Sequence, residues 1–288
     1  MDSDDYWEKE CVEECIKAFA KCEEQGKNVE VVWFEFYFLT NGKITTDGNW
    51  IQIYGAEERI LTPQEWAQKT YYFWFSTLGL IDFKFLKSIK LKFLNEVLYE
   101  DANFGIMLFM QAQRIFRLPK MLYCYRIREQ STMRPTTIQM PPAYLQSIYL
   151  SFNKNITYLN TYNRARSLFL LTLQIVDFFN SLPQNEPTKI AKQSFLPYYL
   201  KQSFYIFDFY NDPLELQKQF YKLLPYMDYI KPSFYQKLVI HCPISLYPLL
   251  TKFRAAYLWQ RDFERKFRRW WKSILKCKKR LKSYSNFE

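Results

Sequence analysis

The segment Val29–Thr40, VEVVWFEFYFLT, decides the fold class predicted for this chain. It is rich in β-branched and aromatic residues, which favour strands over helices. Asn41-Gly42 follows at once and predicts a hairpin-type turn, so we expect a second strand around Ile51–Tyr54. A β-sheet is therefore expected early in the chain.

Helical patterns flank this strand on both sides. Asp5 and Glu8 have the spacing of a capping box and predict a helix start, and this helix should end near Gly26. Its expected apolar face consists of Val12, Cys15, Ile16, Phe19 and Cys22. Downstream, Thr62–Glu65 predicts another helix start, with threonine as the cap and proline in the first turn.

The rest of the first 140 residues also alternates helix and strand. Asp101–Gln113 predicts a helix, and Ile115–Leu118 and Met121–Ile127 predict short strands around Pro119-Lys120. The residues that this helix should bury are Phe104, Met107, Leu108 and either Met110 or Gln111. The alternation predicts an α/β fold for residues 1–140. Beyond them the periodicity is helical and interrupted by prolines, so we expect residues 141–288 to form an all-helical region.

The composition is that of a folded protein with a large core. Of 288 residues, 49% are hydrophobic and 20% are aromatic, which excludes a disordered chain. The formal net charge of +11 is unevenly distributed, because Met1–Glu30 is acidic whereas Arg254–Lys282 is strongly basic. Such a basic end fits an anionic partner, which is a membrane surface, a nucleic acid or a nucleotide.

The cysteines indicate a reducing compartment. Cys11, Cys15 and Cys22 share one face of the first expected helix, and the sequence contains no CxxC pair, which favours buried structural thiols over metal ligands. The sequence shows no signal peptide and no apolar run long enough to span a bilayer. We therefore expect a cytoplasmic protein.

Two clusters of acidic residues are the candidate functional groups. Asp2, Asp4 and Asp5 precede the first helix, and Glu100-Asp101 opens a later one. Clustered carboxylates suit Mg²⁺ or Mn²⁺, because these hard cations prefer oxygen ligands and keep positions free for phosphate oxygens. Both clusters also have a purely structural explanation, since carboxylates cap helices and favour the positive end of the helix dipole. Metal-assisted group transfer is the chemistry that fits both.

Three segments resemble motifs of the family 2 glycosyltransferases with the GT-A fold. Asp2–Glu8, DSDDYWE, resembles the segment that carries their DxD motif, and Tyr99–Phe104, YEDANF, resembles their YEDxxF segment. Leu122–Met133, LYCYRIREQSTM, resembles their LYxYRxxxxSxM segment. The order and the separations agree with the family. The layout is similar to that of bacterial lipooligosaccharide galactosyltransferases, which also have a basic helical C-terminus.

The resemblance implies a role for each segment. Asp4 is the direct ligand of Mn²⁺ or Mg²⁺, and Asp2 lies near the nucleotide ribose or a metal-bound water, whereas Asp5 caps the helix. Asp101 is the general base that deprotonates the acceptor hydroxyl, with Glu100 beside it, although Asp101 as a plain helix N-cap remains an alternative. The diphosphate-binding residues implied by the third segment are Arg126, Arg128 and Ser131.

The resemblance also implies the reaction, which moves a sugar from a UDP-sugar to a lipooligosaccharide or capsule acceptor with inversion. Many relatives have a metal-binding histidine where Arg128 stands, so metal coordination at Arg128 is excluded. His241, the only histidine, is expected to be a packing residue. The aromatic residues expected either to fill the core or to stack on the acceptor sugar are Trp33, Trp50, Trp66, Tyr71, Tyr72 and, favoured as an acceptor contact, Trp74.

The chain departs from the family at its start. The resemblance covers Met1 to about Met133, and the roughly 80 to 90 residues that precede the DxD motif in the family, which form its nucleotide-binding half, are absent. Three explanations stay open: a start codon assigned too late, a gene split by a frameshift, or a non-catalytic remnant. We expect the 288-residue polypeptide to bind sugar nucleotides poorly and to turn over little.

The basic C-terminus has its own expected role. In residues 257–282 apolar and aromatic side chains fall mostly on one helical face, and Lys and Arg dominate the other. This pattern is typical of an interfacial helix on an anionic membrane, here the inner face of the cytoplasmic membrane, where a lipid-linked acceptor would lie. A docking helix with a solvated basic face is the structural alternative. A nucleic-acid-binding module is the rival class, but no nucleic acid is expected, because no recognised nucleic-acid-binding fold accompanies the helix.

Overall fold

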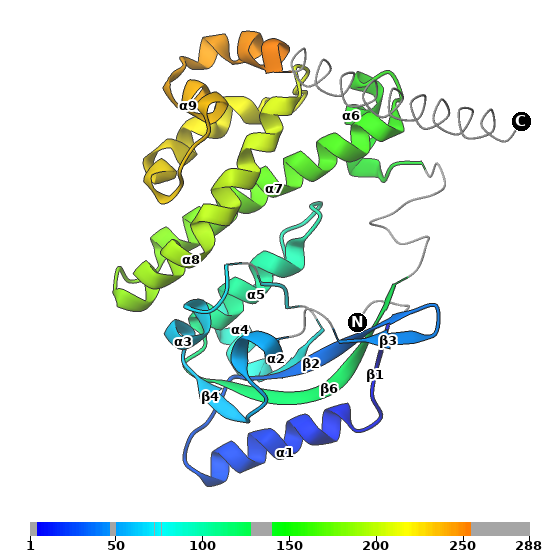
Figure 1. The fold of residues 1–288 in the computed structure, drawn as a ribbon, viewed down its shortest axis with the longest axis vertical. Coiled ribbons are helices and arrows are strands. Elements are labelled where there is room, and N and C mark those ends of the chain that lie inside the picture. The colour runs from blue at the N-terminus through cyan, green and yellow to red at the C-terminus, as the bar shows by residue number, and fades with distance from the viewer. Residues whose placement is uncertain (1–4, 47–49, 72, 76, 128–139, 255–288) are drawn as a thin grey trace, which may run out of the picture.

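A computed structural model describes residues 5–46, 50–71, 73–75, 77–127 and 140–254. Within these residues, six strands form one mixed sheet that is followed by a helical region, which confirms the predicted α/β class with a helical C-terminal part (Figure 1). The centre of the sheet consists of two long parallel strands, β2 (Val31–Thr40) and β6 (Ile115–Ile127).

Four short strands border this central pair, all antiparallel to their neighbour. On the outer edge of β6 lie β1 (Tyr6–Trp7) and β4 (Arg59–Leu61). On the outer edge of β2 lie β3 (Lys43–Thr45) and β5 (Gly79–Ile81).

The turn after β2 confirms the predicted hairpin, but the second strand lies elsewhere. Asn41 and Gly42 have φ angles of 49° and 77°, the left-handed conformation that a tight hairpin turn needs. The returning strand is β3, directly after the turn, whereas Ile51–Tyr54 forms the short helix α2. The prediction of a strand at Ile51–Tyr54 was therefore wrong, since Trp50 and Tyr54 turn into the core at helical spacing.

The strand β6 runs through the proline that was expected to divide it. Residues Ile115–Arg117 pair with Val31–Trp33 in one register, and residues from Met121 onward pair with β2 in a shifted register. Pro119 lies between these two paired stretches, where its lack of an amide hydrogen costs no ladder bond with β2. The result is one bulged strand in place of two short ones.

An ion pair is buried inside this irregular stretch. Arg117 and Glu35 are both 0% exposed and bind each other directly, and Glu35 also accepts a hydrogen bond from the Trp50 amide at 3.1 Å. The Arg117 guanidinium lies 4.7 Å from the centre of the Trp33 ring. Burial lowers the pKa of Arg117 to about 9, which leaves the group charged at neutral pH.

The helix α1 (Cys11–Glu24) covers one face of the sheet (Figure 1). Cys11, Cys15 and Cys22 are buried in the core, as predicted for structural thiols. The expected start at Asp5–Glu8 was wrong, because the cap residue is Glu10 and it makes no side-chain cap bond. The buried stripe is completed by Ala18, whereas two residues of the expected apolar face, Val12 and Ile16, are exposed.

The other face of the sheet carries two short helices and one longer helix. They are α3 (Pro63–Ala67), α4 (Phe83–Ile89) and α5 (Glu100–Gln111). The predicted capping box at Thr62 and Glu65 begins α3. The helix α5 buries Phe104, Leu108 and Met110 as expected, and its Phe109 ring lies 5.5 Å from the Trp33 ring of β2.

The residues after the sheet form a helical layer. Its elements are η1 (Ala143–Leu145), α6 (Gln146–Ser151), α7 (Ile156–Ser181), α8 (Glu186–Ser203), η2 (Phe204–Asp208), η3 (Leu216–Tyr229), α9 (Phe234–His241) and η4 (Ile244–Leu246). The layer packs on the α/β part through α7 against α5 and α8 against α3, where the Trp66 and Phe195 rings are 5.2 Å apart. No helix among the described residues combines the length and apolar character that a bilayer crossing requires.

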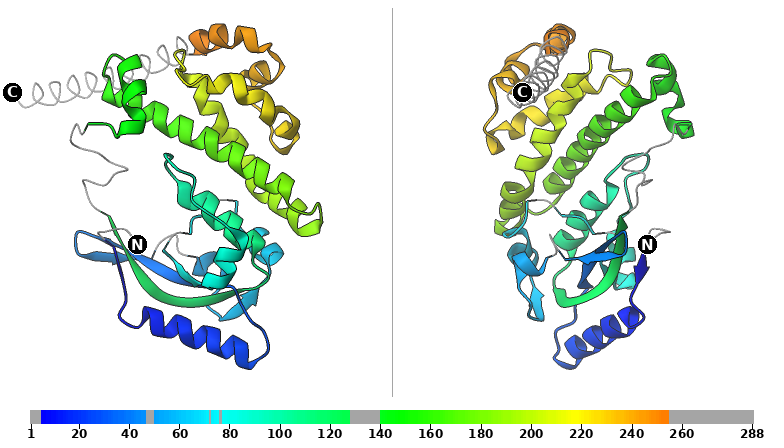
Figure 2. Two further views of the ribbon diagram at one scale, coloured as in Figure 1. Left: turned by 180° about the vertical axis from the view of Figure 1, so that it is seen from behind. Right: turned by 45° about the vertical axis from the view of Figure 1, so that its right-hand side comes forward.

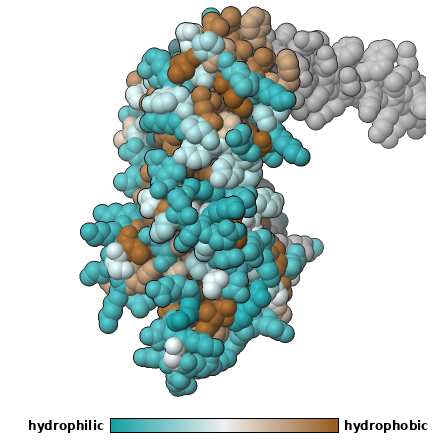
Figure 3. Space-filling model, turned by 90° about the vertical axis from the view of Figure 1, so that its left-hand side faces the viewer, coloured by the Kyte–Doolittle hydropathy of each residue, from teal (hydrophilic) through white to brown (hydrophobic). Residues whose placement is uncertain are grey.

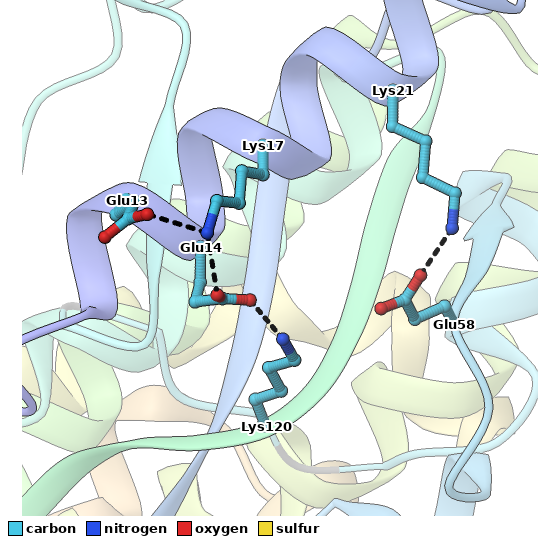
Figure 4. A network of polar contacts seen from close by, with 6 residues as sticks. All are labelled: Glu13, Glu14, Lys17, Lys21, Glu58 and Lys120. Atoms are coloured by element: carbon cyan, nitrogen blue, oxygen red, sulfur yellow. Dashed lines mark hydrogen bonds and ion pairs between the residues drawn. The ribbon is translucent and has the colours of Figure 1, made fainter.

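Ion pairs connect residues of α1 to one another, to β6 and to the residue before β4 (Figure 4). Lys17 binds Glu13 at 2.7 Å, Glu14 also binds Lys120 of β6, and Lys21 binds Glu58 at 2.7 Å. Except for Glu14, which is 18% exposed, these side chains are open to solvent, so water and salt screen the pairs. They orient α1 on the sheet and add little to the stability of the fold.

The contrast between the buried and the exposed pairs is testable. Replacing Glu35 with leucine leaves the Arg117 charge buried without its partner, which should cost about 3–5 kcal/mol of folding free energy. Urea denaturation should show a large drop in midpoint, whereas Lys17→Gln on α1 should leave the midpoint nearly unchanged. The double variant Glu35→Leu/Arg117→Met should recover most of the loss. A near-native midpoint for Glu35→Leu alone would contradict the role given to the pair.

Candidate functional site

Asp5 joins the start of the chain to the end of β6. One carboxylate oxygen accepts a hydrogen bond from the Arg126 amide at 2.8 Å, and the other accepts one from the Tyr123 hydroxyl. The pairing of Tyr6 with Cys124 continues this contact along β1. Asp5 is 8% exposed and therefore acts as a link between strands, so its predicted role as a helix cap was wrong.

A chain of hydroxyl groups continues from this link. The Tyr37 hydroxyl donates to the Glu8 carboxylate at 2.5 Å and lies 3.1 Å from the Tyr6 hydroxyl. Burial, followed by the hydrogen bond to Glu8, raises the pKa of Tyr37 well above its usual value, so Tyr37 remains a donor at neutral pH. The indole of Trp7 donates to the Thr77 carbonyl at 3.2 Å. Thus β1 contacts both the sheet and the loop before β5.

The second acidic pair occupies the first turn of α5. Glu100 and Asp101 are its first two residues, at the positive end of the helix dipole. The cap position belongs to Tyr99, which has a φ of 66° and makes no side-chain cap bond. The alternative that Asp101 is the N-cap was therefore wrong. A left-handed backbone costs a bulky residue about 1–2 kcal/mol, and such strain is concentrated at functional sites.

The helical layer holds the segment that leads into this turn. The Leu98 amide donates to the Ser167 hydroxyl at 2.9 Å, and Arg166 donates to the Glu96 carbonyl at 2.6 Å. Within α5 itself, the side-chain amide of Asn103 donates to the backbone carbonyl of Leu171 at 2.8 Å. These contacts with α7 fix the backbone on both sides of Tyr99.

The loop that contains Phe73–Phe75 and Thr77 connects the two acidic regions. The Phe75 amide donates to the Asp101 carbonyl at 3.5 Å, and the Thr77 carbonyl accepts from Trp7 of β1. Between them, the Trp74 ring lies 6.2 Å from the Tyr125 ring of β6. Figures 1 and 2 show that α5 begins on the side of the sheet where β2 and β6 end.

The predicted site residues divide into two groups. Glu100 and Asp101 lie on α5, and Arg126 is exposed at the end of β6 with its backbone bound to Asp5. The others, Asp2, Asp4, Arg128 and Ser131, lie outside the described residues, as does Tyr72. Among the residues that are described, no group of three or more His, Cys, Asp or Glu side chains could hold a metal ion.

The aromatic candidates separate by burial. Trp33, Trp50 and Trp66 are buried in the core, whereas Trp74 is half-buried and Tyr71 is 68% exposed. The expectation that His241 packs in the core was wrong, because it is exposed at the last position of α9, where the helix faces solvent.

One part of the region was not foreseen from the sequence. A cavity of about 180 Å³ lies between α5, α7 and α8, lined by Tyr99, Tyr198 and Gln202 among others. The exposed Tyr71 ring lies 6.3 Å from the Tyr198 ring at this place. Burial, and then the neighbouring phenols of Tyr99, Tyr205 and Tyr71, raise the pKa of Tyr198. No periodic pattern links these residues, because they come from both parts of the chain.

The chain matches no protein-family model and no curated protein. Among solved structures, it is similar to S. aureus TarS 1-349 in complex with UDP, with a TM-score of 0.43, 16% identity and coverage of 88% of this chain and 62% of that chain. A second structure, S. aureus TarS, gives a TM-score of 0.45 at 16% identity and covers 88% of this chain and 39% of that chain. The chain thus spans less than two thirds of the length of both structures.

The role of Asp5 can be tested by hydrogen exchange. Asp5→Ala removes both acceptors that hold the end of β6, and each hydrogen bond to a charged group is worth about 1.5–3 kcal/mol. We expect the Arg126 amide to exchange at least tenfold faster, with the amides of the first turn of α1 unchanged. Glu10→Ala, which removes an exposed acid at the α1 cap, is the matched control. Faster exchange in α1 with a protected Arg126 would restore the helix-cap interpretation.

Proposed function

We propose that this protein is a family 2 glycosyltransferase with the GT-A fold that transfers a sugar from a UDP-sugar to a surface-glycan acceptor, with inversion. The observation that carries the proposal is the meeting of three distant segments at one end of the sheet. Asp5–Trp7, Asp101 and Tyr123–Arg126 all contact each other or the loop at Phe73–Thr77. The likeness to TarS adds no weight at TM-scores of 0.43 and 0.45.

In this proposal Asp101 is the general base. As the acceptor hydroxyl oxygen bonds to the anomeric carbon, its proton passes to the Asp101 carboxylate, and the bond from that carbon to the diphosphate oxygen breaks. Such a base must be ionised beforehand, and the partial positive charge at the start of α5 favours the ionised form. The left-handed Tyr99 backbone, and the hydrogen bonds of the preceding Leu98 amide and Glu96 carbonyl to α7, support a rigidly positioned carboxylate. Glu100 adds negative charge beside it.

Donor binding is assigned to the segments on either side of the Asp5 link. Both oxygens of Asp5 accept hydrogen bonds, so the proposed metal ligands are Asp4 and Asp2, whose carboxylates suit Mn²⁺ or Mg²⁺. When bound, the cation would offset the charge that develops on the leaving diphosphate. Arg126, together with Arg128 and Ser131, would bind the phosphate oxygens. The side chain of Arg126 is exposed and its backbone is fixed, which suits this role.

The acceptor is assigned to the aromatic surface at the junction of the two parts. Tyr99, Tyr198 and the amide of Gln202 line the cavity next to the first turn of α5, and the exposed Tyr71 ring lies 6.3 Å from the Tyr198 ring. Ligand sites favour such junctions, and aromatic rings with a few polar groups suit the alternating apolar and hydroxyl-bearing faces of sugars. Trp74 remains a further candidate. A lipid-linked or lipooligosaccharide acceptor would be met at the inner face of the cytoplasmic membrane, with residues 257–282 on the anionic surface.

The general-base assignment has a direct test. Asp101→Asn should lower sugar transfer at least 100-fold, since general acid–base catalysis contributes about 10²–10⁴-fold, while the Kd for UDP with Mn²⁺ stays within twofold. Calorimetry and a donor-turnover assay measure the two effects. The matched control is Asp228→Asn at an exposed position of η3, which should change neither.

The same measurements separate the alternatives. UDP binding without turnover in the unaltered protein would indicate a catalytically inactive remnant. A complete absence of UDP binding would exclude the transferase, and the protein would then be interpreted as a peripheral membrane or nucleic-acid-binding module. Full activity in Asp101→Asn would show that Asp101 is not the general base, and the assignment of the protein as a transferase would stand.

The acceptor surface predicts a separate effect. Tyr71→Ala should raise the KM for the acceptor by roughly five- to tenfold, because a stacked ring contributes about 1 kcal/mol, and it should leave the Kd for UDP unchanged. Tyr210→Ala is the control, since Tyr210 is similarly exposed (60% against 68% for Tyr71) and adjoins Asn211, which contacts α6. Equal KM values for both variants would exclude this surface from acceptor binding.

A further inference from the structure

The far end of the helical layer exposes an apolar surface, here called the α9 surface. Its members are Phe234, Leu238, Ile244, Leu246, Leu249 and Phe253. The two phenylalanines are 78% and 65% exposed, and they line a groove of about 580 Å³ together with Leu238 and Leu250. Figure 3 shows apolar side chains gathered over the upper part of the molecule, where α9 lies. An apolar surface of this kind marks a place of contact with a partner or a membrane.

The α9 helix is apolar on two sides, which the packing of the fold does not require. Its inner side is held by the buried Val239 and by Tyr235, whose hydroxyl donates to the Phe207 carbonyl at 3.3 Å. Phe234 and Leu238, four residues apart, form the outer side and face solvent. The helix also carries Gln236 and the exposed Lys237, so Phe234 and Leu238 form a separate apolar side. Because Val239 and Tyr235 already pack the inner side, the outer side is open to contact with a partner or a membrane.

Within residues 231–254, which carry the α9 surface, every charged side chain is positive. Between residues 231 and 254 the sequence contains Lys231, Lys237, Lys252 and Arg254 and neither aspartate nor glutamate. The three lysines are exposed, whereas Arg254 is paired with Asp208 at 3.0 Å. The sequence that follows, residues 255–282, has eleven Lys and Arg against two acidic residues. A partner that fits this surface therefore has negatively charged groups at its surface and an apolar region directly below them.

We propose that the α9 surface inserts into the interfacial region of an anionic lipid bilayer, with Phe234, Leu238 and Phe253 among the lipid chains and the lysines at the headgroups. Exposed aromatic and aliphatic tips surrounded by lysine are the chemistry of interfacial binding. This surface lies within the folded helical layer, so the inference concerns residues other than 257–282. It is independent of the proposed transferase activity and holds with or without it.

The experiment measures sedimentation of the complete protein with vesicles. One set contains phosphatidylcholine alone, and the other contains phosphatidylcholine and phosphatidylglycerol at three to one. The unaltered protein should bind the second set and largely ignore the first at physiological salt. Phe234→Ser/Phe253→Ser should reduce partitioning at least tenfold, because each ring loses its burial in lipid. Lys237→Gln/Lys252→Gln should reduce it by about fivefold per lysine.

The matched control is Phe83→Ser on α4, which removes an equally exposed ring (68%) from the α/β part. It should bind vesicles as the unaltered protein does. Thermal melting of all variants should coincide, because the replaced side chains are exposed. Unchanged vesicle binding in the Phe234/Phe253 variant would overturn the proposal, because residues outside the α9 surface would then account for the binding. A concentration-dependent dimer that this variant abolishes, with no vesicle binding, would also overturn it and identify a second copy of the chain as the occupant.

Discussion

The buried ion pair between Glu35 and Arg117 is the constraint on which the sheet depends. Two charges with no exposed surface must stay together, because either one alone in the core would be costly. Apolar side chains allow strands to slip, but a charge pair defines one alignment. Here the pair lies where the register of β2 and β6 changes. The second carboxylate oxygen of Glu35 accepts a hydrogen bond from the Trp50 backbone amide at 3.1 Å. The same pair thus fixes the sheet and the start of α2.

The irregular register has a consequence for the candidate site. Between the pairs Trp33–Arg117 and Phe36–Tyr123, β2 advances three residues and β6 advances six, so β6 bulges around Pro119. The bulge redirects the second half of β6, which then accepts β1 on its outer edge. Asp5 completes this arrangement by binding the Arg126 amide and the Tyr123 hydroxyl. The segments Asp5–Trp7 and Tyr123–Arg126 are thus held together in the part of β6 beyond the bulge.

The helical layer contributes to the same region from the other side. Contacts of Ser167 and Arg166 with the backbone at Leu98 and Glu96 hold the approach to α5, and Tyr99 keeps its left-handed conformation there. A strained residue persists only when its surroundings determine it. The position of Glu100 and Asp101 therefore depends on α7 as much as on α5. The α/β part and the helical layer are therefore in direct contact at this turn.

The sequence by itself determined the elements whose signals are local. The run at Val29–Thr40, the turn at Asn41-Gly42 and the capping box at Thr62 are set by residues within a few positions of each other, and all three form as expected. Tertiary structure decided the rest. Asp5 has the spacing of a helix cap, yet it binds Arg126, 121 residues away, because a paired strand offers its carboxylate a better-fixed donor. The tyrosine cavity brings Tyr99 to Tyr198, and long-range packing of this kind leaves no periodic trace along the chain.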